Sequence, residues 1–337
     1  MIRSHFPRRL RLSLLSAGLA VAIAAVPGCG LLGGSDDASS GGGNVQVEQA
    51  KVKVGIIPQL IDIAGFQRAQ SAGYFSKEGL TIETVAIKSA TDAVPQFKAN
   101  QLAFAFGNWT TFIEAQAQKA VDLRMVSDAL QAREGMTALV TMPDSGIKTP
   151  KDMPGKTIGV NALKSNVELT TRAVLEANDV NPNTVQFKVI PTTNALNALQ
   201  TKQIDVMSLQ EPNLTTAKQK LGVVIVADRA TGPVSDFPIS GYVTSAQFAK
   251  DNPKTVAAFQ RAMAKGQSDM ADRRVVEETL LQYAGIDKDI AKTVGVGVFP
   301  TSVDGTRLQR VADLMLTYGI LKEKFDINPM IYRAPTS

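Results

Sequence analysis

The chain has 337 residues, of which 44% are hydrophobic and 20% charged, and its formal net charge is +5. This is the composition of a folded protein with a large core and room for two domains, and it excludes a disordered, collagen-like or coiled-coil chain. Cysteine and histidine occur once each, at Cys29 and His5. If the N-terminus is removed on export, these counts exclude a Ser-His-Asp triad, a Cys-His pair and a zinc site built on His and Cys.

Residues 1–28 are predicted to be an export signal. Their start carries four arginines and no acidic residue, and the apolar run of residues 12–26 that follows is short for a membrane span. The stretch Val26-Pro27-Gly28-Cys29 resembles the cleavage box of bacterial lipoproteins, which implies a diacylglycerol on the Cys29 sulfur and a membrane anchor. A plain signal peptide with an incidental cysteine is the alternative.

The mature chain is expected to be nearly neutral. Removal of residues 1–28 takes away four arginines and no acid, so the formal net charge falls from +5 to +1. The charge balance therefore gives no argument for nucleic-acid binding. Residues 29–50 comprise the lipid-attachment cysteine and a Gly-, Ser- and Asp-rich stretch, which we expect to be a flexible tether.

From Lys51 onward, β-rich runs alternate with helical patterns. In the first unit, strands are expected at 51–57, 80–87, 102–106 and 123–127, and helices at 62–72, 92–100 and 110–119. Asp62 is a plausible N-cap of the first helix. This order predicts a mostly parallel sheet with helices on both faces.

A second unit repeats this rhythm. Strands are expected at 157–161, 185–190, 204–209 and 223–227, and helices at 165–178, 194–201 and 212–220. Residues 82–106 can be laid against 185–208 at an offset of about a hundred residues, the size of one domain. We therefore expect two similar α/β lobes, although coincidence is the alternative, because any two βαβ units share this spacing.

The remaining chain is predicted to be helical and to cover a lobe already formed. Residues 136–142 and 239–244 are interpreted as paired crossover strands that form the hinge between the lobes. Lobe 1, with the C-terminal helices, is then made by residues 51–140 and 240–337, and lobe 2 by residues 141–239.

Three stretches resemble a known family of solute-binding proteins. They are residues 69–80 (AQSAGYFSKEGL), 148–159 (KTPKDMPGKTIG) and 195–212 (ALNALQTKQIDVMSLQEP). These resemble the "GYF-x-x-EGL" turn, the "DLxGKxIGV" entry to lobe 2 and the "AL-x-x-GxxDA…EP" stretch of the nitrate/sulfonate/taurine branch of ABC-importer binding proteins, which also includes thiamine-pyrimidine binders. The resemblance implies a type II periplasmic-binding-protein fold, with two α/β lobes, each a mostly parallel sheet flanked by helices, and two crossover hinge strands.

The chain departs from this family at one repeated motif. The family usually has Gly-x-x-Asp before the third strand of each lobe, where this chain has Lys202-Gln-Ile-Asp205 and Asn100-Gln-Leu-Ala103. These positions are structural, so the expected fold is unaffected. The pocket loops of the family vary more freely, which leaves the ligand open.

Ligands of open α/β sheets bind beyond the carboxyl ends of the strands, where helix N-termini favour anions. The residues expected to contact a ligand there are Gln59, Asn108, Trp109, Thr110, Ser165, Asn166, Glu211 and Asp236. Trp109 is expected to form a flat wall of the cleft, because a Gly-Asn-Trp-Thr loop is a poor core site; packing in the core is the alternative. Ser165 and Asn166 could serve only as helix caps. Glu211 and Asp236 would repel an anion and so favour an amine-bearing or zwitterionic solute, unless Glu211 only complements a helix dipole.

These features favour a binding protein that captures a small polar solute by hinge closure and delivers it to an ABC permease and ATPase. Sulfonate, taurine, nitrate or a similar solute is expected, and a thiamine-precursor pyrimidine or another amine-bearing heterocycle is the alternative. The protein is expected to be a monomer on the outer side of the cell membrane, without catalytic residues, metal, cofactor or nucleic-acid partner. An enzyme on the same scaffold, with acid–base work by Glu211 and Asp236, and a surface sensor or adhesin are the remaining hypotheses.

Overall fold

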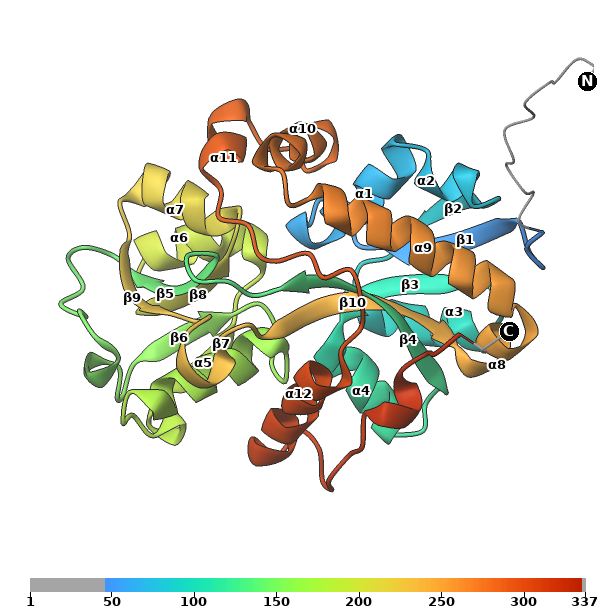
Figure 1. Ribbon diagram of the computed structural model, residues 1–337. Helices are drawn as coiled ribbons and strands as arrows, with labels where there is room; N and C mark the ends of the chain where they lie inside the picture. Colours follow the sequence, from blue (N-terminus) through green and yellow to red (C-terminus); the bar gives the residue numbers. More distant parts are fainter. Residues whose placement is uncertain (1–45, 335–337) are drawn as a thin grey trace, which may run out of the picture. The chain divides into compact units, whose positions relative to one another are not determined.

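The computed structural model describes residues 46–334, so the predicted export signal and Cys29 lie outside the described residues. These residues contain two five-stranded sheets with the orders β2-β1-β3-β10-β4 and β7-β6-β8-β5-β9 (Figure 1). The first sheet consists of β1 (Lys51–Ile56), β2 (Thr81–Ala86), β3 (Phe104–Asn108), β4 (Leu123–Gln131) and β10 (Pro238–Ser245). The second consists of β5 (Thr137–Thr141), β6 (Thr157–Val160), β7 (Gln186–Val189), β8 (Val206–Gln210) and β9 (Val224–Asp228).

Helices cover both faces of each sheet. Those around the first sheet are α1 (Ala64–Ser71), α2 (Tyr74–Lys77), α3 (Ala93–Lys98), α4 (Trp109–Ala117), α8 (Ala246–Asp251), α9 (Pro253–Asp269), α10 (Arg273–Tyr283) and α12 (Gly305–Thr317). Those around the second are α5 (Asn166–Ala177), α6 (Ala195–Gln200) and α7 (Asn213–Leu221). Helix α11 (Lys288–Thr293) packs between α10 and α7. Short 3-10 helices are η1 (Ile61–Ile63), η2 (Ala90–Asp92), η3 (Pro150–Asp152), η4 (Pro182–Thr184), η5 (Thr192–Asn194), η6 (Gly232–Val234) and η7 (Asn328–Met330). In Figure 1, α1 and α9 lie on one side of the first sheet and α4 and α12 on the other, while α5 lies across the second sheet from α6 and α7.

The two sheets have the same topology. In each, the first strand of the unit pairs in parallel with the second and third strands, as β1 does with β2 and β3 and β6 does with β7 and β8. One antiparallel strand is inserted beside the third strand, β10 in the first sheet and β5 in the second. A threonine of this strand donates to an equivalent carbonyl in both, Thr244 to Ala103 at 2.6 Å and Thr141 to Asp205 at 2.7 Å. The predicted pair of similar α/β units is therefore present.

The two departures from the family motif have a backbone consequence. Asn100 and Lys202, which stand where the family has glycine, adopt φ values of 53° and 57°. This left-handed region favours glycine, and Asn tolerates it better than Lys. Asp205 accepts a hydrogen bond at 2.8 Å from the N–H of Thr157, at the start of β6. The acid of the motif thus ties the start of β6 to the segment before β8.

The prediction that residues 136–142 and 239–244 pair with each other is wrong. β10 pairs with β3 and β4, with Pro238 opposite Gln131, whereas β5 pairs with β8 and β9. The cause is that β4 continues to Gln131, further than the predicted 123–127, and so supplies the partner of β10. The expected lobe boundaries at 140/141 and 239/240 fall inside β5 and β10.

The end of the predicted tether is bound to the folded body. The Glu48 carboxylate accepts hydrogen bonds from the N–H groups of Lys254 and Thr255, at 3.0 and 2.8 Å. These N–H groups belong to the first turn of α9, where a negative charge is favourable. Within residues 46–334, no helix combines the length and hydropathy that a membrane crossing requires.

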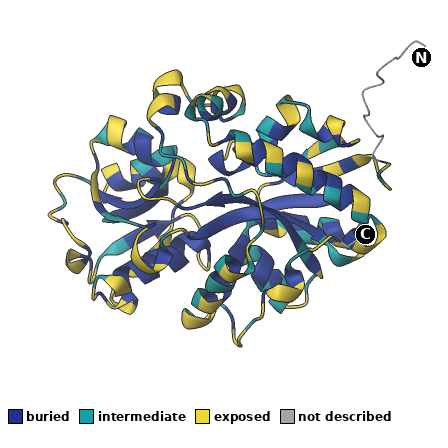
Figure 2. Cartoon of the chain, in the orientation of Figure 1, coloured by how far each residue is buried: buried dark blue, intermediate teal, exposed yellow. Residues whose placement is uncertain are grey.

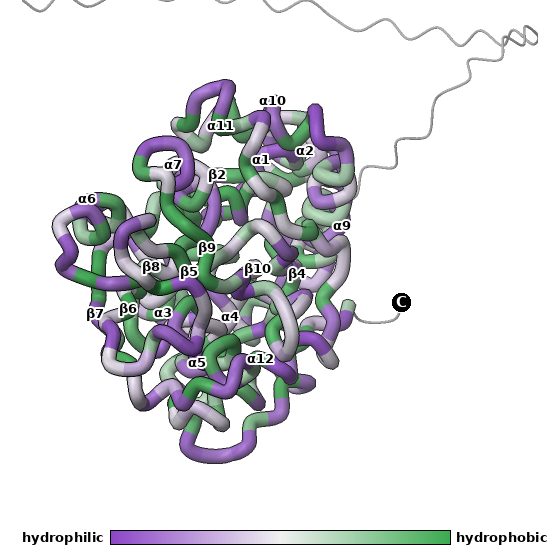
Figure 3. The backbone as a smooth tube through the Cα atoms, turned by 90° about the vertical axis from the view of Figure 1, so that its left-hand side faces the viewer, coloured by the Kyte–Doolittle hydropathy of each residue, from purple (hydrophilic) through white to green (hydrophobic). Residues whose placement is uncertain are grey.

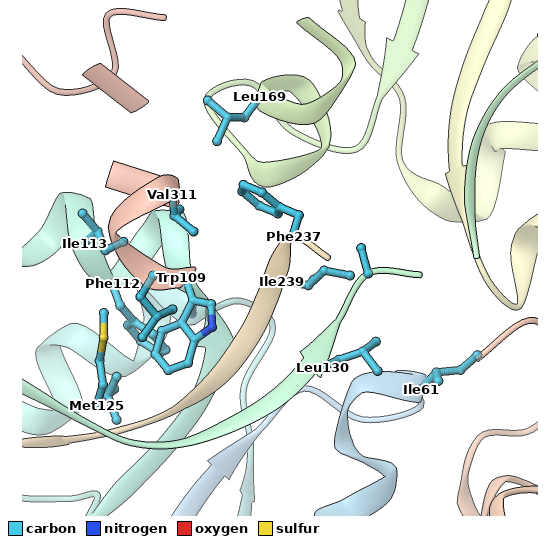
Figure 4. Packing of buried hydrophobic residues seen from close by; sticks show 14 of the residues in the cluster. Ile61, Trp109, Phe112, Ile113, Met125, Leu130, Leu169, Phe237, Ile239 and Val311 are labelled. Atoms are coloured by element: carbon cyan, nitrogen blue, oxygen red, sulfur yellow. The ribbon is translucent and has the colours of Figure 1, made fainter. Parts of the chain in front are cut away.

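Buried apolar side chains fill the space around both sheets. Most residues of the inner strands are buried, and exposed residues lie on the outer helix faces and turns (Figure 2). Figure 3 gives the same distribution by hydropathy, with hydrophilic residues at many of the outer turns. One cluster combines Leu169 of α5 and Phe237 before β10 with residues of the first sheet such as Leu130 (Figure 4). The two sheets are therefore joined by a continuous apolar contact.

Candidate functional site

A buried carboxyl group links the two sheets. Asp62 lies in η1, beyond the carboxyl end of β1, and only 5% of its surface is exposed. Its Oδ2 accepts a 2.7 Å hydrogen bond from the Ser240 hydroxyl of β10, and its Oδ1 accepts a 3.1 Å bond from Gln210 Nε2 at the end of β8. The carboxyl ends of β1 and β8 therefore meet at one buried polar contact.

The expected role of Asp62 as a helix N-cap is wrong. Its side chain makes no cap bond, and Ile63 occupies the N-cap position of α1. Burial raises the pKa of Asp62 above its ordinary value, against the hydrogen bonds from Ser240 and Gln210 that lower it. A buried carboxyl group whose partners are neutral donors retains acceptor capacity for a further group.

A row of three residues crosses neighbouring strands of the second sheet: Gln210, Thr137 and Arg229. Gln210 of β8 lies opposite Thr137 of β5, and the Thr137 carbonyl accepts the N–H of Arg229, which follows β9. Residues opposite each other on antiparallel strands share a face. Ser208, two residues before Gln210, shares that face and lies 3.1 Å from the Thr171 hydroxyl of α5. The row therefore faces α5.

Arg229 is the buried cation of this row. Only 3% of its surface is exposed; its Nη1 donates to the Thr170 hydroxyl at 2.6 Å and its Nη2 to the Leu209 carbonyl at 3.2 Å. Burial lowers the pKa of Arg229 to about 10, against the attraction of Asp228, so the guanidinium is still charged at neutral pH. Because Leu209 precedes Gln210, this charge lies beside the residue that reaches Asp62.

Two predicted site residues, Asn108 and Thr110, lie close to this contact. Asn108 is opposite Ser240 in the β3–β10 ladder. Its Oδ1 accepts from the N–H of Thr111 at 2.9 Å and from the hydroxyl of Thr110 at 2.7 Å, so it caps α4. Both side chains lie at the carboxyl end of β3, where the sequence predicts them. The Asn108 side chain already serves as the cap of α4.

Ser165 and Asn166 lie at the start of α5, which carries Thr170 and Thr171 one turn later. Ser165 is the N-cap: its Oγ accepts from the N–H of Glu168 at 3.4 Å and donates to the Ala162 carbonyl at 2.8 Å. Both Ser165 and Asn166 are 9% exposed. Ser165 therefore has the capping role that the alternative interpretation gives it.

The structure does not bring Glu211, Gln59 and Asp236 to the Asp62 contact. The oxygens of Glu211 accept from the N–H and hydroxyl of Thr215 in α7, at 2.9 and 2.8 Å, and from the N–H of Gly295 at 3.2 Å. Glu211, which precedes the N-cap residue Pro212, therefore accepts a first-turn N–H of α7 and ties this helix to the segment after α11, as its dipole alternative implies. Gln59 and Asp236 are exposed turn residues with positive φ.

Trp109 is a core residue, so the expectation that its loop is a poor core site is wrong. Its side chain is fully buried among Phe112, Met125 and Val311 (Figure 4). The indole Nε1 donates to Asp128 Oδ1 at 3.2 Å, which satisfies its one polar atom. This is possible because Trp109 begins α4, whose inner face packs under β10.

The described surface cavities lie away from the predicted site residues. One, of 1080 Å³, is bordered by Lys98, Arg124 and Tyr332, and a cavity of 480 Å³ between α5 and residues 318–320 includes Lys164. None of the eight predicted ligand residues lines either one. At the Asp62–Gln210 contact, the segment after β1 and the end of β8 are joined directly by a side-chain hydrogen bond.

The residues at this contact are not among those that the sequence predicts to bind a ligand; they are Asp62, Thr137, Gln210, Arg229 and Ser240. The rule that ligands gather at strand ends applies to Gln210, which follows the β-run that ends at Leu209, and to Arg229, which comes two residues after the run 223–227. Thr137 and Ser240 had no such signal, because their relevance depends on the strand order.

The fold is that of periplasmic binding proteins. The aliphatic sulphonate binding protein SsuA of Escherichia coli superposes with a TM-score of 0.72 at 16% identity, covering 86% of this chain and 94% of that one. The alkanesulfonate-binding protein SsuA of Xanthomonas axonopodis pv. citri, solved with MOPS bound, gives 0.72 at 16% identity, covering 86% and 100%. The nitrate-binding protein NrtA of Synechocystis PCC 6803 gives 0.66 at 14% identity, covering 83% and 84%.

The chain belongs to the NMT1/THI5-like family, whose sequence pattern matches residues 61–275, more than half of its length. No curated protein matches the chain in sequence. The family expected from the three sequence motifs is therefore confirmed.

Proposed function

We propose that the protein is an extracytoplasmic substrate-binding lipoprotein of an ABC importer. Its two lobes close on a small polar solute, such as a sulfonate, taurine or nitrate, and release it unchanged to a permease and its ATPase. The observation that carries this proposal is the part-buried hydrogen bond from Gln210 to the Asp62 carboxyl, because it joins the carboxyl ends of strands from two sheets, where α/β proteins bind ligands. The family membership and the fold of the sulfonate- and nitrate-binding proteins support it.

The topology supports this mechanism of closure. The sheets are joined by residues 132–136, between β4 and β5, and by residues 229–237, between β9 and β10. A solute that contacts both sheets binds the closed arrangement better than the open one and shifts the population toward it. Export and lipid attachment at Cys29 would hold the protein at the outer face of the membrane, beside its permease.

Titration calorimetry and thermal unfolding of the purified protein test this function. The panel is taurine, ethanesulfonate, nitrate and an aminopyrimidine. We expect saturable binding of one of these solutes and a higher melting temperature in its presence. If none binds, this assignment of the solute class fails. Conversion of a solute by the protein would instead support an enzyme.

A further inference from the structure

Two buried donors without a partner lie next to each other in the second sheet. Arg229 Nε and Thr137 Oγ1 are both buried and make no hydrogen bond within residues 46–334. The two residues face each other, since the Thr137 carbonyl accepts the Arg229 N–H at 2.9 Å. Buried polar atoms in folded proteins are nearly always paired, so two neighbouring exceptions point to a ligand.

The charge of Arg229 strengthens this argument. Among the ion pairs of residues 46–334, none includes Arg229, and the oxygens of the adjacent Asp228 accept from the N–H groups of Gly135 and Ala230. A buried cation is costly unless an anion pairs with it. The Thr170 hydroxyl accepts from Nη1 and the Leu209 carbonyl from Nη2, and these two bonds hold the guanidinium in a fixed orientation.

The surrounding groups suit an oxyanion. Arginine presents its N–H groups in a planar fork that matches two oxygens of a sulfonate or carboxylate. The Thr137 hydroxyl adds a donor at the same place. Gln210, which lies opposite Thr137 in the β5–β8 ladder, donates a hydrogen bond to Asp62. An anion bound by Arg229 and Thr137 would therefore lie next to the residue that joins the two sheets.

We propose that Arg229 and Thr137 bind the anionic group of the solute, an oxyanion with at least two acceptor oxygens. This inference rests on the proposed function and adds to it the residues that select for negative charge. It moves the anion contact away from the helix starts at Ser165 and Glu211, whose capping bonds are already made.

Calorimetry with a charged probe and its neutral analogue tests this inference. The probes are methanesulfonate and acetate, with dimethyl sulfone as the uncharged counterpart of methanesulfonate. We expect the wild-type protein to bind at least one anion and not the sulfone. Arg229→Gln should lower the affinity for the anion at least tenfold, because the charged donor is lost. Thr137→Val should lower it about fivefold, because one hydrogen bond is lost. Arg333→Gln, which removes the same charge from an exposed position, should leave the affinity unchanged.

A folded Arg229→Gln or Thr137→Val protein that retains the wild-type affinity for the anion overturns the inference. Melting temperature and circular dichroism without ligand establish folding, and Thr137→Val deletes only an unpaired hydroxyl, so it serves if Arg229→Gln does not fold. Binding of only an uncharged pyrimidine by the wild-type protein also overturns it, while the proposed capture function stands. If the wild-type protein binds neither the anions nor any panel solute, both proposals fail.

Discussion

Gln210 Nε2 donates to Asp62 Oδ1 at 3.1 Å, and this bond joins the end of β8 in the second sheet to the segment after β1 in the first. The two residues are 148 positions apart in the chain. Gln210 is the last residue of β8, the middle strand of its sheet, and Asp62 follows β1, an interior strand of the other sheet. The contact is where a solute would be in reach of both sheets.

Replacement of Gln210 by leucine should destabilise the protein. The change leaves the buried Asp62 Oδ1 without its donor, which costs about 1–3 kcal/mol in the free energy of unfolding. Gln247→Leu is the matched control, because Gln247 Nε2 donates to Asp251 Oδ2 at 2.7 Å on the exposed surface; it should cost less than about 0.5 kcal/mol. Urea unfolding measures the free energy of unfolding of both variants. Equal losses would contradict the greater burial of the Gln210–Asp62 contact.

Stability should fall as the pH rises from 5 to 8. Burial raises the pKa of Asp128 from 3.8 to about 7, against the attraction of Arg307 at 3.0 Å. Between these two values the folded state holds a proton that the unfolded state has released. The stabilisation is thus complete below about pH 4 and is lost as the pH passes 7, with an upper limit of roughly 4 kcal/mol.

Asp128→Asn tests the origin of this pH dependence. The only histidine is His5, so no histidine of residues 46–334 titrates in the same window. Urea unfolding of the variant at pH 5, 6.5 and 8 should give a much flatter profile; the raised pKa of Asp62 leaves a remaining slope of the same sign. A variant as steep as the wild type would exclude Asp128 as the cause.

Lys202→Gly should stabilise the protein. Lys202 has a φ of 57°, a left-handed conformation that costs a residue other than glycine about 1–2 kcal/mol, so a gain of up to about 1 kcal/mol is expected after the flexibility of glycine is counted. Its surface ion pair with Asp144 contributes little. Asn100→Gly should gain less, because Asn tolerates this conformation. The midpoint of thermal unfolding measures the stability of both variants. A loss of stability in Lys202→Gly would contradict backbone strain at Lys202.

Trp109 offers a test of its own burial, since it is the only tryptophan. Its emission should be blue-shifted and nearly insensitive to acrylamide, and a bound solute should leave it unchanged. Trp109→Phe should cost about 1–3 kcal/mol, because it leaves a void beside Gly241 and removes the hydrogen bond to Asp128. Strong quenching by acrylamide would place the ring at an open cleft instead.

Most secondary-structure elements could be predicted because their causes are local. Apolar alternation and turn residues place strands such as β1 and β8 to within a few residues. The sheet order could not be derived in full, since β4 and β10 pair across more than a hundred residues. Their pairing depends on the length of β4, which local patterns underestimate.

The candidate site was harder to predict for the same reason. Asp62 resembles a helix cap in sequence, and only the approach of Gln210 from the other sheet reveals its contact. Trp109 looked exposed because its neighbours are polar, but those neighbours cap α4 while the ring turns inward. Arg229 and Thr137 become a pair through the β5–β9 register, which no local pattern encodes.

The distance between the two sheets, with and without solute, tests closure most directly. Spin labels on the exposed positions Lys77 of α2 and Lys188 of β7, in a Cys29→Ser background, report it by double electron–electron resonance. A saturating solute from the panel should shorten and narrow the distance distribution. An unchanged distribution, at a concentration where calorimetry gives full binding, would contradict capture between the sheets.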